Sequence, residues 1–203
     1  MNNSFTKTQK MVGTGVLAAV VIVLQLISTF GLHIGPVPIS LVLIPIAIGA
    51  IIYGPSAGAF LGAVFGVVVI GMILGGLDPA SMLMLQYNAP ATIITCLGKG
   101  ILAGFVCGIV YKAFVGMKKG TLGAIIGTVL CPIVNTGIYV LMVCFVFTGL
   151  MEDAYKISGV KAVFVTLVSM ITVNFVSELV ITVVLTPVVL QIIKIVTRAS
   201  RSN

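Results

Sequence analysis

The sequence is poor in the charged residues that soluble proteins carry on their surfaces. Of its 203 residues only 11 are Lys or Arg and only 4 are Asp or Glu, whereas 60% are hydrophobic. Soluble domains carry about 25% charged residues, so this composition excludes a soluble globular protein. The net charge of +7 would favour a nucleic-acid partner only in a soluble chain, and we expect no nucleic acid here. An integral membrane protein is predicted instead.

Residues that carry most enzyme and metal chemistry are also scarce. There is no tryptophan, one histidine (His33), and four cysteines that all lie within apolar runs. Without a CxxC pair or a Cys/His cluster we expect neither a disulfide nor a metal site, and the thiols should be small buried hydrophobic groups. HExxH and a glycine-rich phosphate loop followed by Lys-Ser/Thr are absent as well. We therefore predict no catalytic residue, no cofactor and no enzyme.

What the sequence does have is a series of long apolar runs. A helix needs about 20 apolar residues to cross the hydrocarbon layer, so the chain has room for roughly six spans. We predict a single all-α membrane domain over residues 1–203. Its six transmembrane helices are expected at about 11–30, 39–52, 56–74, 89–115, 121–147 and 161–196. The second is short, and we expect it to be tilted, partly buried or extended into the preceding loop.

The basic residues gather in three short clusters between these runs. Six spans place both termini and the middle cluster on one side of the membrane, with the acidic residues Asp78, Glu152 and Asp153 on the other. Because positively charged loops stay in the cytoplasm, we predict that the N- and C-termini are cytoplasmic. The three clusters consist of Lys7, Lys10, Lys112, Lys118, Lys119, Lys194, Arg198 and Arg201.

Glycines recur at every fourth position around the third predicted span. Gly54, Gly58, Gly62 and Gly66 would stack on one helix face and let a neighbouring backbone come close. We expect this face to pack inside the protein, with docking of another subunit as the alternative.

Two ionisable residues, Lys99 and Glu178, lie deep in predicted spans. An ionisable side chain is costly in a bilayer and normally faces a partner or a cavity. At about 1.5 Å per residue, Lys99 lies roughly 16 Å from the outer end of the fourth span, and Glu178 lies somewhat deeper in the sixth. Either the two form an ion pair, or Lys99 binds an anionic group of a ligand that Glu178 orients.

Amides accompany these charges. Asn174 lies four residues before Glu178 on the same helix face. Asn135 follows Pro132, which frees a backbone carbonyl one turn earlier, and such breaks are tolerated where a cavity is lined. Each asparagine is a candidate ligand-binding residue, and each could equally join two helices.

The predicted outer loops add His33, Gln86 and Asn88. These residues lie at the outer mouth above Lys99 and the two asparagines. An outward-facing, partly polar cavity for a small solute is the simplest common explanation.

Several stretches together are typical of one family. The first span is rich in small residues, Gly15-Val-Leu-Ala-Ala19, and a Pro-rich loop follows it. The strongest local match is Ile39-Ser-Leu-Val-Leu-Ile-Pro-Ile-Ala-Ile-Gly-Ala-Ile-Ile-Tyr-Gly-Pro-Ser-Ala-Gly58. On these residues the chain resembles the substrate-binding S-components of energy-coupling factor (ECF) vitamin transporters, over nearly its whole length.

This resemblance implies a high-affinity vitamin-binding subunit in the plasma membrane of a prokaryote. Such proteins associate with a membrane coupling subunit and two cytoplasmic ATPases. Small residues of the first span form the docking face in this family, so Gly15, Ala18 and Ala19 inherit that role. The ligand sits in the outer half, beneath a gating first loop at residues 33–40.

The ligand implied first is pantothenate. The stretch Cys131-Pro-Ile-Val-Asn-Thr-Gly137 looks like that of the pantothenate branch. Lys99 suits a carboxylate in a low-dielectric pocket, and Asn135 and Asn174 could bond the amide and hydroxyls.

Other ligands and other classes of protein stay open at this point. Riboflavin ranks second and another B-type vitamin third, since Tyr87, Tyr139 and Phe175 could stack on a flat ring. A self-sufficient small-solute transporter or channel would show inverted repeats, and the two three-span halves offer no convincing match. A structural subunit would need only the glycine face and an ion pair.

Overall fold

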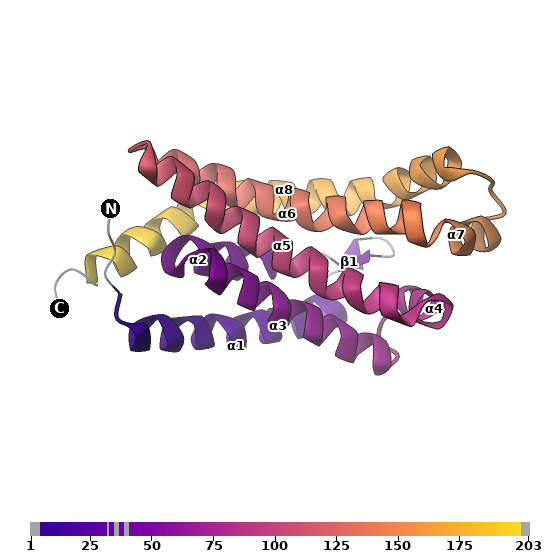
Figure 1. Ribbon diagram of the computed structural model, residues 1–203, viewed down its shortest axis with the longest axis horizontal. Helices are drawn as coiled ribbons and strands as arrows, with labels where there is room; N and C mark the ends of the chain where they lie inside the picture. The colour runs from indigo at the N-terminus through magenta and orange to yellow at the C-terminus, as the bar shows by residue number, and fades with distance from the viewer. Residues whose placement is uncertain (1–4, 32, 35–36, 39–40, 200–203) are drawn as a thin grey trace.

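The computed structural model describes residues 5–31, 33–34, 37–38 and 41–199, and most of them are helical (Figure 1). Five of the helices contain a stretch long and apolar enough to cross a membrane. These helices are α1 (Lys7–Gly31), α3 (Pro55–Leu74), α5 (Ala89–Gly116), α6 (Gly120–Val146) and α8 (Val160–Ala199). The prediction of an all-α integral membrane protein is confirmed.

The remaining predicted span corresponds to α2 (Leu43–Tyr53), which has only 11 residues. It begins four residues later than predicted, and residues 39–40 lie outside the described part. A helix of this length measures about 16 Å, roughly half the hydrocarbon thickness. Nearly all of its side chains are buried, because α1, α3, α5, α6 and α8 all pack against it. The structure thus makes α2 a core helix, and a sixth crossing stays a prediction.

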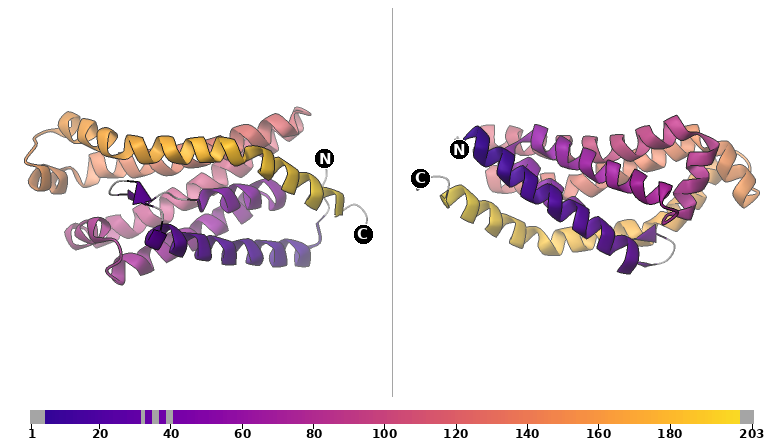
Figure 2. Two further views of the ribbon diagram at one scale, coloured as in Figure 1. Left: turned by 180° about the vertical axis from the view of Figure 1, so that it is seen from behind. Right: turned by 90° about the horizontal axis from the view of Figure 1, so that it is seen from below.

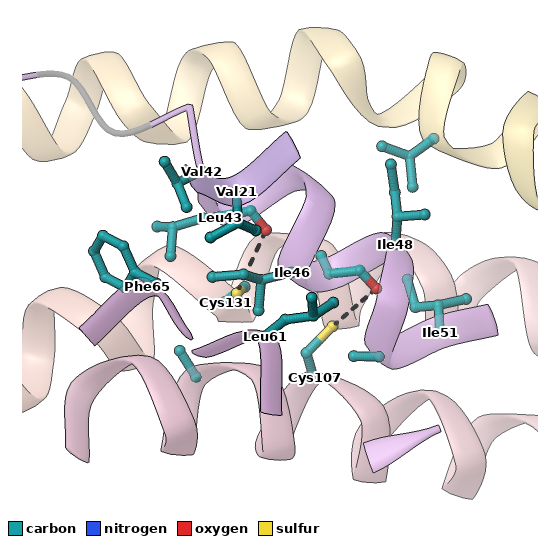
Figure 3. Packing of buried hydrophobic residues seen from close by; sticks show 14 of the residues in the cluster. Val21, Val42, Leu43, Ile46, Ile48, Ile51, Leu61, Phe65, Cys107 and Cys131 are labelled. Atoms are coloured by element: carbon teal, nitrogen blue, oxygen red, sulfur yellow. Dashed lines mark hydrogen bonds between the residues drawn. The ribbon is translucent and has the colours of Figure 1, made fainter. Parts of the chain in front are cut away.

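The packing around α2 involves two cysteine thiols (Figure 3). The Cys107 Sγ of α5 donates to the carbonyl oxygen of Ala47 at 4.0 Å, and the Cys131 Sγ of α6 donates to that of Leu43 at 3.8 Å. All four cysteines are buried and free, as the sequence predicted. Two of them thus add weak hydrogen bonds to the apolar contacts that hold α2.

The glycines of α3 pack directly on the backbone of α5. A Cβ added at Gly58, Gly62 or Gly66 would overlap a carbonyl oxygen of α5. In return, a Cβ at Gly100 or Gly104 would overlap a carbonyl oxygen of α3. Only glycine permits this approach of two backbones, so the expected packing of this face inside the protein is confirmed.

Gly54 was wrongly assigned to the same face. Its φ is +104°, which no residue within a right-handed helix adopts, and nothing lies within 4 Å of a Cβ placed there. Gly54 instead forms the turn between α2 and α3, where its N–H donates to the carbonyl oxygen of Ala50 at 3.1 Å. Glycine is favoured here because it has no side chain to oppose the positive φ.

Two short helices and a small hairpin lie between the long helices. They are α4 (Pro79–Tyr87), α7 (Thr148–Tyr155) and the antiparallel strands β1 (His33–Ile34) and β2 (Val37–Pro38). The sequence predicted an outer loop where α4 forms. The Asp78 carboxylate accepts from the backbone N–H of Ser81 at 3.0 Å, and Pro79 presets the first turn, so a helix starts there.

The termini, turns and short helices are divided between the two ends of the bundle. α1 begins and α8 ends at the same end of the bundle as the α5–α6 turn with Lys118 and Lys119, and α4 and α7 lie at the opposite end (Figures 1 and 2). We call the first the basic end and the second the α4/α7 end. This arrangement agrees with the predicted clustering of basic residues, while the cytoplasmic location of the basic end stays a prediction.

Candidate substrate site

Lys99 is the centre of the candidate site. It lies ten residues into α5 from the α4/α7 end, about 15 Å along the helix. Its Nζ is 5.6 Å from the ring centre of Phe65 on α3 and 5.5 Å from that of Tyr139 on α6. Both distances are those of cation–π contacts. The two alternatives for Lys99, an ion pair with Glu178 or an anionic ligand group, both stay predictions.

The glycine contact between α3 and α5 places Lys99 beside Phe65. Gly100, the next residue, packs on α3 so closely that a Cβ there would lie 3.0 Å from Phe65 Cδ1. The adjacent lysine is thereby brought to the edge of the α3–α5 contact. Tyr139 closes the other side from α6, and its hydroxyl donates to Met84 Sδ of α4 at 3.9 Å.

Asn135 lies one turn before Tyr139 on α6 and is 7% exposed. Its Oδ1 is buried and has no hydrogen-bond partner among the described residues. A buried acceptor left unpaired costs about 1–3 kcal/mol, so it indicates a place where a missing donor belongs.

Glu178 of α8 is 5% exposed and shares a helix face with Thr182 and Thr186, which are also buried. Its carboxylate is close enough to the Cys131 thiol on α6 for the two groups to interact electrostatically. Cys131 is one turn from Asn135, so the carboxylate lies near the part of the bundle that holds the unpaired amide oxygen. The side chain of Asn174, one turn earlier on α8, lies outside the described residues.

The structure describes the three predicted site residues of the outer loops to different extents. Gln86 is exposed on α4. Asn88 is the N-cap of α5, and its side-chain Oδ1 accepts from the backbone N–H of Ala91 at 3.1 Å. His33 belongs to β1, but its side chain lies outside the described residues.

A polar cluster on α1 was missed by the sequence analysis. Gln25 is 7% exposed and Ser28 is 1% exposed, and both face inward near the end of α1. The Gln25 Nε2 donates to Met72 Sδ of α3 at 3.7 Å, and the Thr29 hydroxyl contacts the same sulfur at 3.1 Å. The Oε1 of Gln25 and the Oγ of Ser28 are buried without a partner in the described chain. The signal available in the sequence was Gln25, a side-chain amide within an apolar run.

The residues expected to dock a partner lie on the outer face of α1. Gly15 and Ala19 are exposed and Ala18 is half-buried, and nothing lies within 4 Å of a Cβ placed at Gly15. Large apolar side chains flank them, such as Val12 and Val16. This face is open to lipid or to a partner helix.

The comparison with protein families gives a match over most of the chain. Comparison with curated proteins gives no match. The family described as "ECF transporter, substrate-specific component" matches residues 9–190, which include α2, every candidate site residue and most of the five long helices. The chain therefore belongs to this family, whose members are membrane-embedded subunits that bind a vitamin-type substrate for an ECF transporter rather than enzymes.

Proposed function

We propose that this chain binds pantothenate with high affinity in the plasma membrane of a prokaryote. The observation that carries this choice is Lys99, an ammonium group in the bundle that contacts the rings of Phe65 and Tyr139. Ring contacts stabilise a cation without neutralising its charge. An anionic ligand group would therefore gain a strong, charge-assisted hydrogen bond, and the carboxylate of pantothenate supplies one.

The unpaired Oδ1 of Asn135 supports the same ligand. An amide oxygen accepts and cannot donate, so its partner must be an N–H or O–H group. Pantothenate carries an amide N–H between its carboxylate and its hydroxyl groups. We assign this N–H to Asn135, and we propose that Asn174 and Glu178 of α8 bond a hydroxyl.

The residues at the α4/α7 end are proposed to form the entrance to the site. His33 and Gln86 would meet the ligand first, and Asn88 would contribute while it caps α5. The hairpin β1–β2 would cover the ligand once it has entered.

Riboflavin is the second candidate ligand, ahead of any other B-type vitamin. The rings of Phe65 and Tyr139, both less than 6 Å from Lys99, could hold a flat ring system if the lysine moved aside. Pantothenate is favoured because it uses the lysine where it lies.

Transport requires partners, because the sequence carries no nucleotide-binding motif. We propose that Gly15, Ala18 and Ala19 dock a membrane coupling subunit through the open face of α1. Two ATPases would bind that subunit at the basic end, in the cytoplasm.

Thermal unfolding of the detergent-purified chain against a panel of vitamins tests this proposal. A ligand that binds only the folded state, present at 100 times its dissociation constant, stabilises it by about 2.7 kcal/mol. We expect a large shift with pantothenate and none with thiamin or biotin. A shift with riboflavin alone would replace the ligand, and no shift with any vitamin would refute the assignment.

A further inference from the structure

Gln25 and Ser28 present two unused hydrogen-bonding atoms in the interior. Both side chains are more than nine-tenths buried, and neither the Gln25 Oε1 nor the Ser28 Oγ has a partner among the described residues. Their neighbour Thr29 differs, because its hydroxyl already donates to the backbone oxygen of Gln25 at 3.0 Å. The lack of partners is therefore specific to two side chains on one turn of α1.

The chemistry of these atoms limits what they can bind. The Gln25 Nε2 is directed at the Met72 sulfur, so the free end of this amide is its oxygen, which only accepts. A carboxylate is ionised at neutral pH and cannot donate to it, whereas a hydroxyl can. The Ser28 hydroxyl both donates and accepts, so it suits the same ligand group.

The inner face of α3 connects this turn to Lys99. Phe65 and Met72 are seven residues apart on α3, so they project from the same helix face about 10 Å apart along its axis. Both are buried, as is Val69 between them. Lys99 contacts Phe65, and Gln25 contacts Met72. One wall of the bundle thus has an ammonium at one end and an unpaired acceptor at the other.

We propose that Gln25 and Ser28 form a second polar end of the substrate site and bind a hydroxyl group of an extended ligand whose acid group lies at Lys99. This inference rests on the proposed function and specifies the class of substrate. The ligand carries a carboxylate at Lys99 and a hydroxyl at α1. Pantothenate has a carboxylate at one end and a hydroxyl at the other. α1 then contacts the ligand as well as the coupling subunit.

Calorimetric titration of the purified full-length chain with pantothenate tests the inference. Gln25→Met has nearly the same shape but lacks the acceptor, and we expect it to weaken binding about tenfold. Thr29→Val is the matched control, because it lies on the same turn and contacts the same methionine but loses a hydroxyl that is already paired. Its affinity should equal that of the unmodified chain. Ser28→Ala, a smaller change, serves if Gln25→Met does not fold.

The terminal-deoxy analogue of pantothenate tests the same contact from the ligand side. It should bind the unmodified chain about tenfold more weakly than pantothenate and lose nothing further with Gln25→Met. Unchanged affinity of Gln25→Met and Ser28→Ala for pantothenate would overturn this inference and leave the proposed function standing. Failure of the unmodified chain to bind pantothenate would overturn the proposed function, and this inference with it.

Discussion

Replacing Gly66 of α3 by alanine should destabilise the protein, whereas the same change at Gly71 on the same helix should not. A Cβ at Gly66 would lie 2.6 Å from the carbonyl oxygen of Cys96 and 2.8 Å from the Cα of Leu97. Ordinary contact begins at 3.4 Å, so α3 and α5 would have to separate by about 0.8 Å at this point. A Cβ at Gly71 meets nothing within 4 Å.

The difference between the two variants isolates the cost of this overlap. Alanine favours a helix over glycine by up to about 1 kcal/mol, and that gain applies to both positions. Forcing an extra carbon into a packed contact typically costs about 1–3 kcal/mol. Gly66→Ala should therefore be less stable than Gly71→Ala by about 1–3 kcal/mol, and Gly71→Ala should be at least as stable as the unmodified chain.

Unfolding in detergent by heat or denaturant, followed by circular dichroism, measures this difference. Because Gly66 packs beside the segment that leads to Lys99, we also expect Gly66→Ala to bind ligand more weakly. Equal stability of the two variants would refute the backbone contact between α3 and α5. The position of Lys99 beside Phe65 would then lose its structural basis.

Two further predictions concern the partner and the orientation. Ala19→Leu should abolish uptake in cells that supply the coupling module, because the larger side chain obstructs the docking face. It should leave pantothenate binding of the purified chain unchanged. Loss of both uptake and binding would contradict docking at α1. Gln86→Cys should react with a membrane-impermeant maleimide added outside intact cells, and Lys118→Cys only after permeabilisation, since all four native cysteines are buried. The reverse labelling pattern would invert the predicted orientation.

The long helices could be predicted from the sequence because each crossing needs an apolar run that prolines, glycines and polar clusters interrupt. The predicted 89–115 became α5 at Ala89–Gly116, and 121–147 became α6 at Gly120–Val146. The short helix α4 was missed because its cue is local: Asp78 caps a segment of nine residues, too short to cross a membrane.

Which face of each helix points inward could not be predicted. In a soluble protein the buried face is apolar and the exposed face polar, but a membrane helix is apolar on both. Phe60 and Phe65 illustrate this, since the first is 54% exposed and the second 3% exposed on the same helix. Packing against the other helices distinguishes them, so the ring beside Lys99 could not be chosen from the sequence.

Polar residues within the predicted spans were a better guide to the site than apolar residues, although one polar pair was missed. Lys99 and Asn135 were singled out because such groups are costly in a bilayer. In the structure Asn135 is buried and Lys99 is half-buried, and both lie near Tyr139. Gln25 and Ser28 satisfy the same criterion. They were passed over because the first span had been interpreted only through its small residues, Gly15 to Ala19.

The central claim is that Lys99 binds the acid group of the ligand. Its most direct test compares the affinities of pantothenate and its alcohol analogue, in which CH₂OH replaces the carboxylate, for the unmodified chain and for Lys99→Met. A charge-assisted hydrogen bond contributes about 1.5–3 kcal/mol, so the unmodified chain should prefer the acid by roughly 10–100-fold. Lys99→Met should bind both ligands equally and weakly. If Lys99→Met binds pantothenate as tightly as the unmodified chain does, Lys99 is not part of the site.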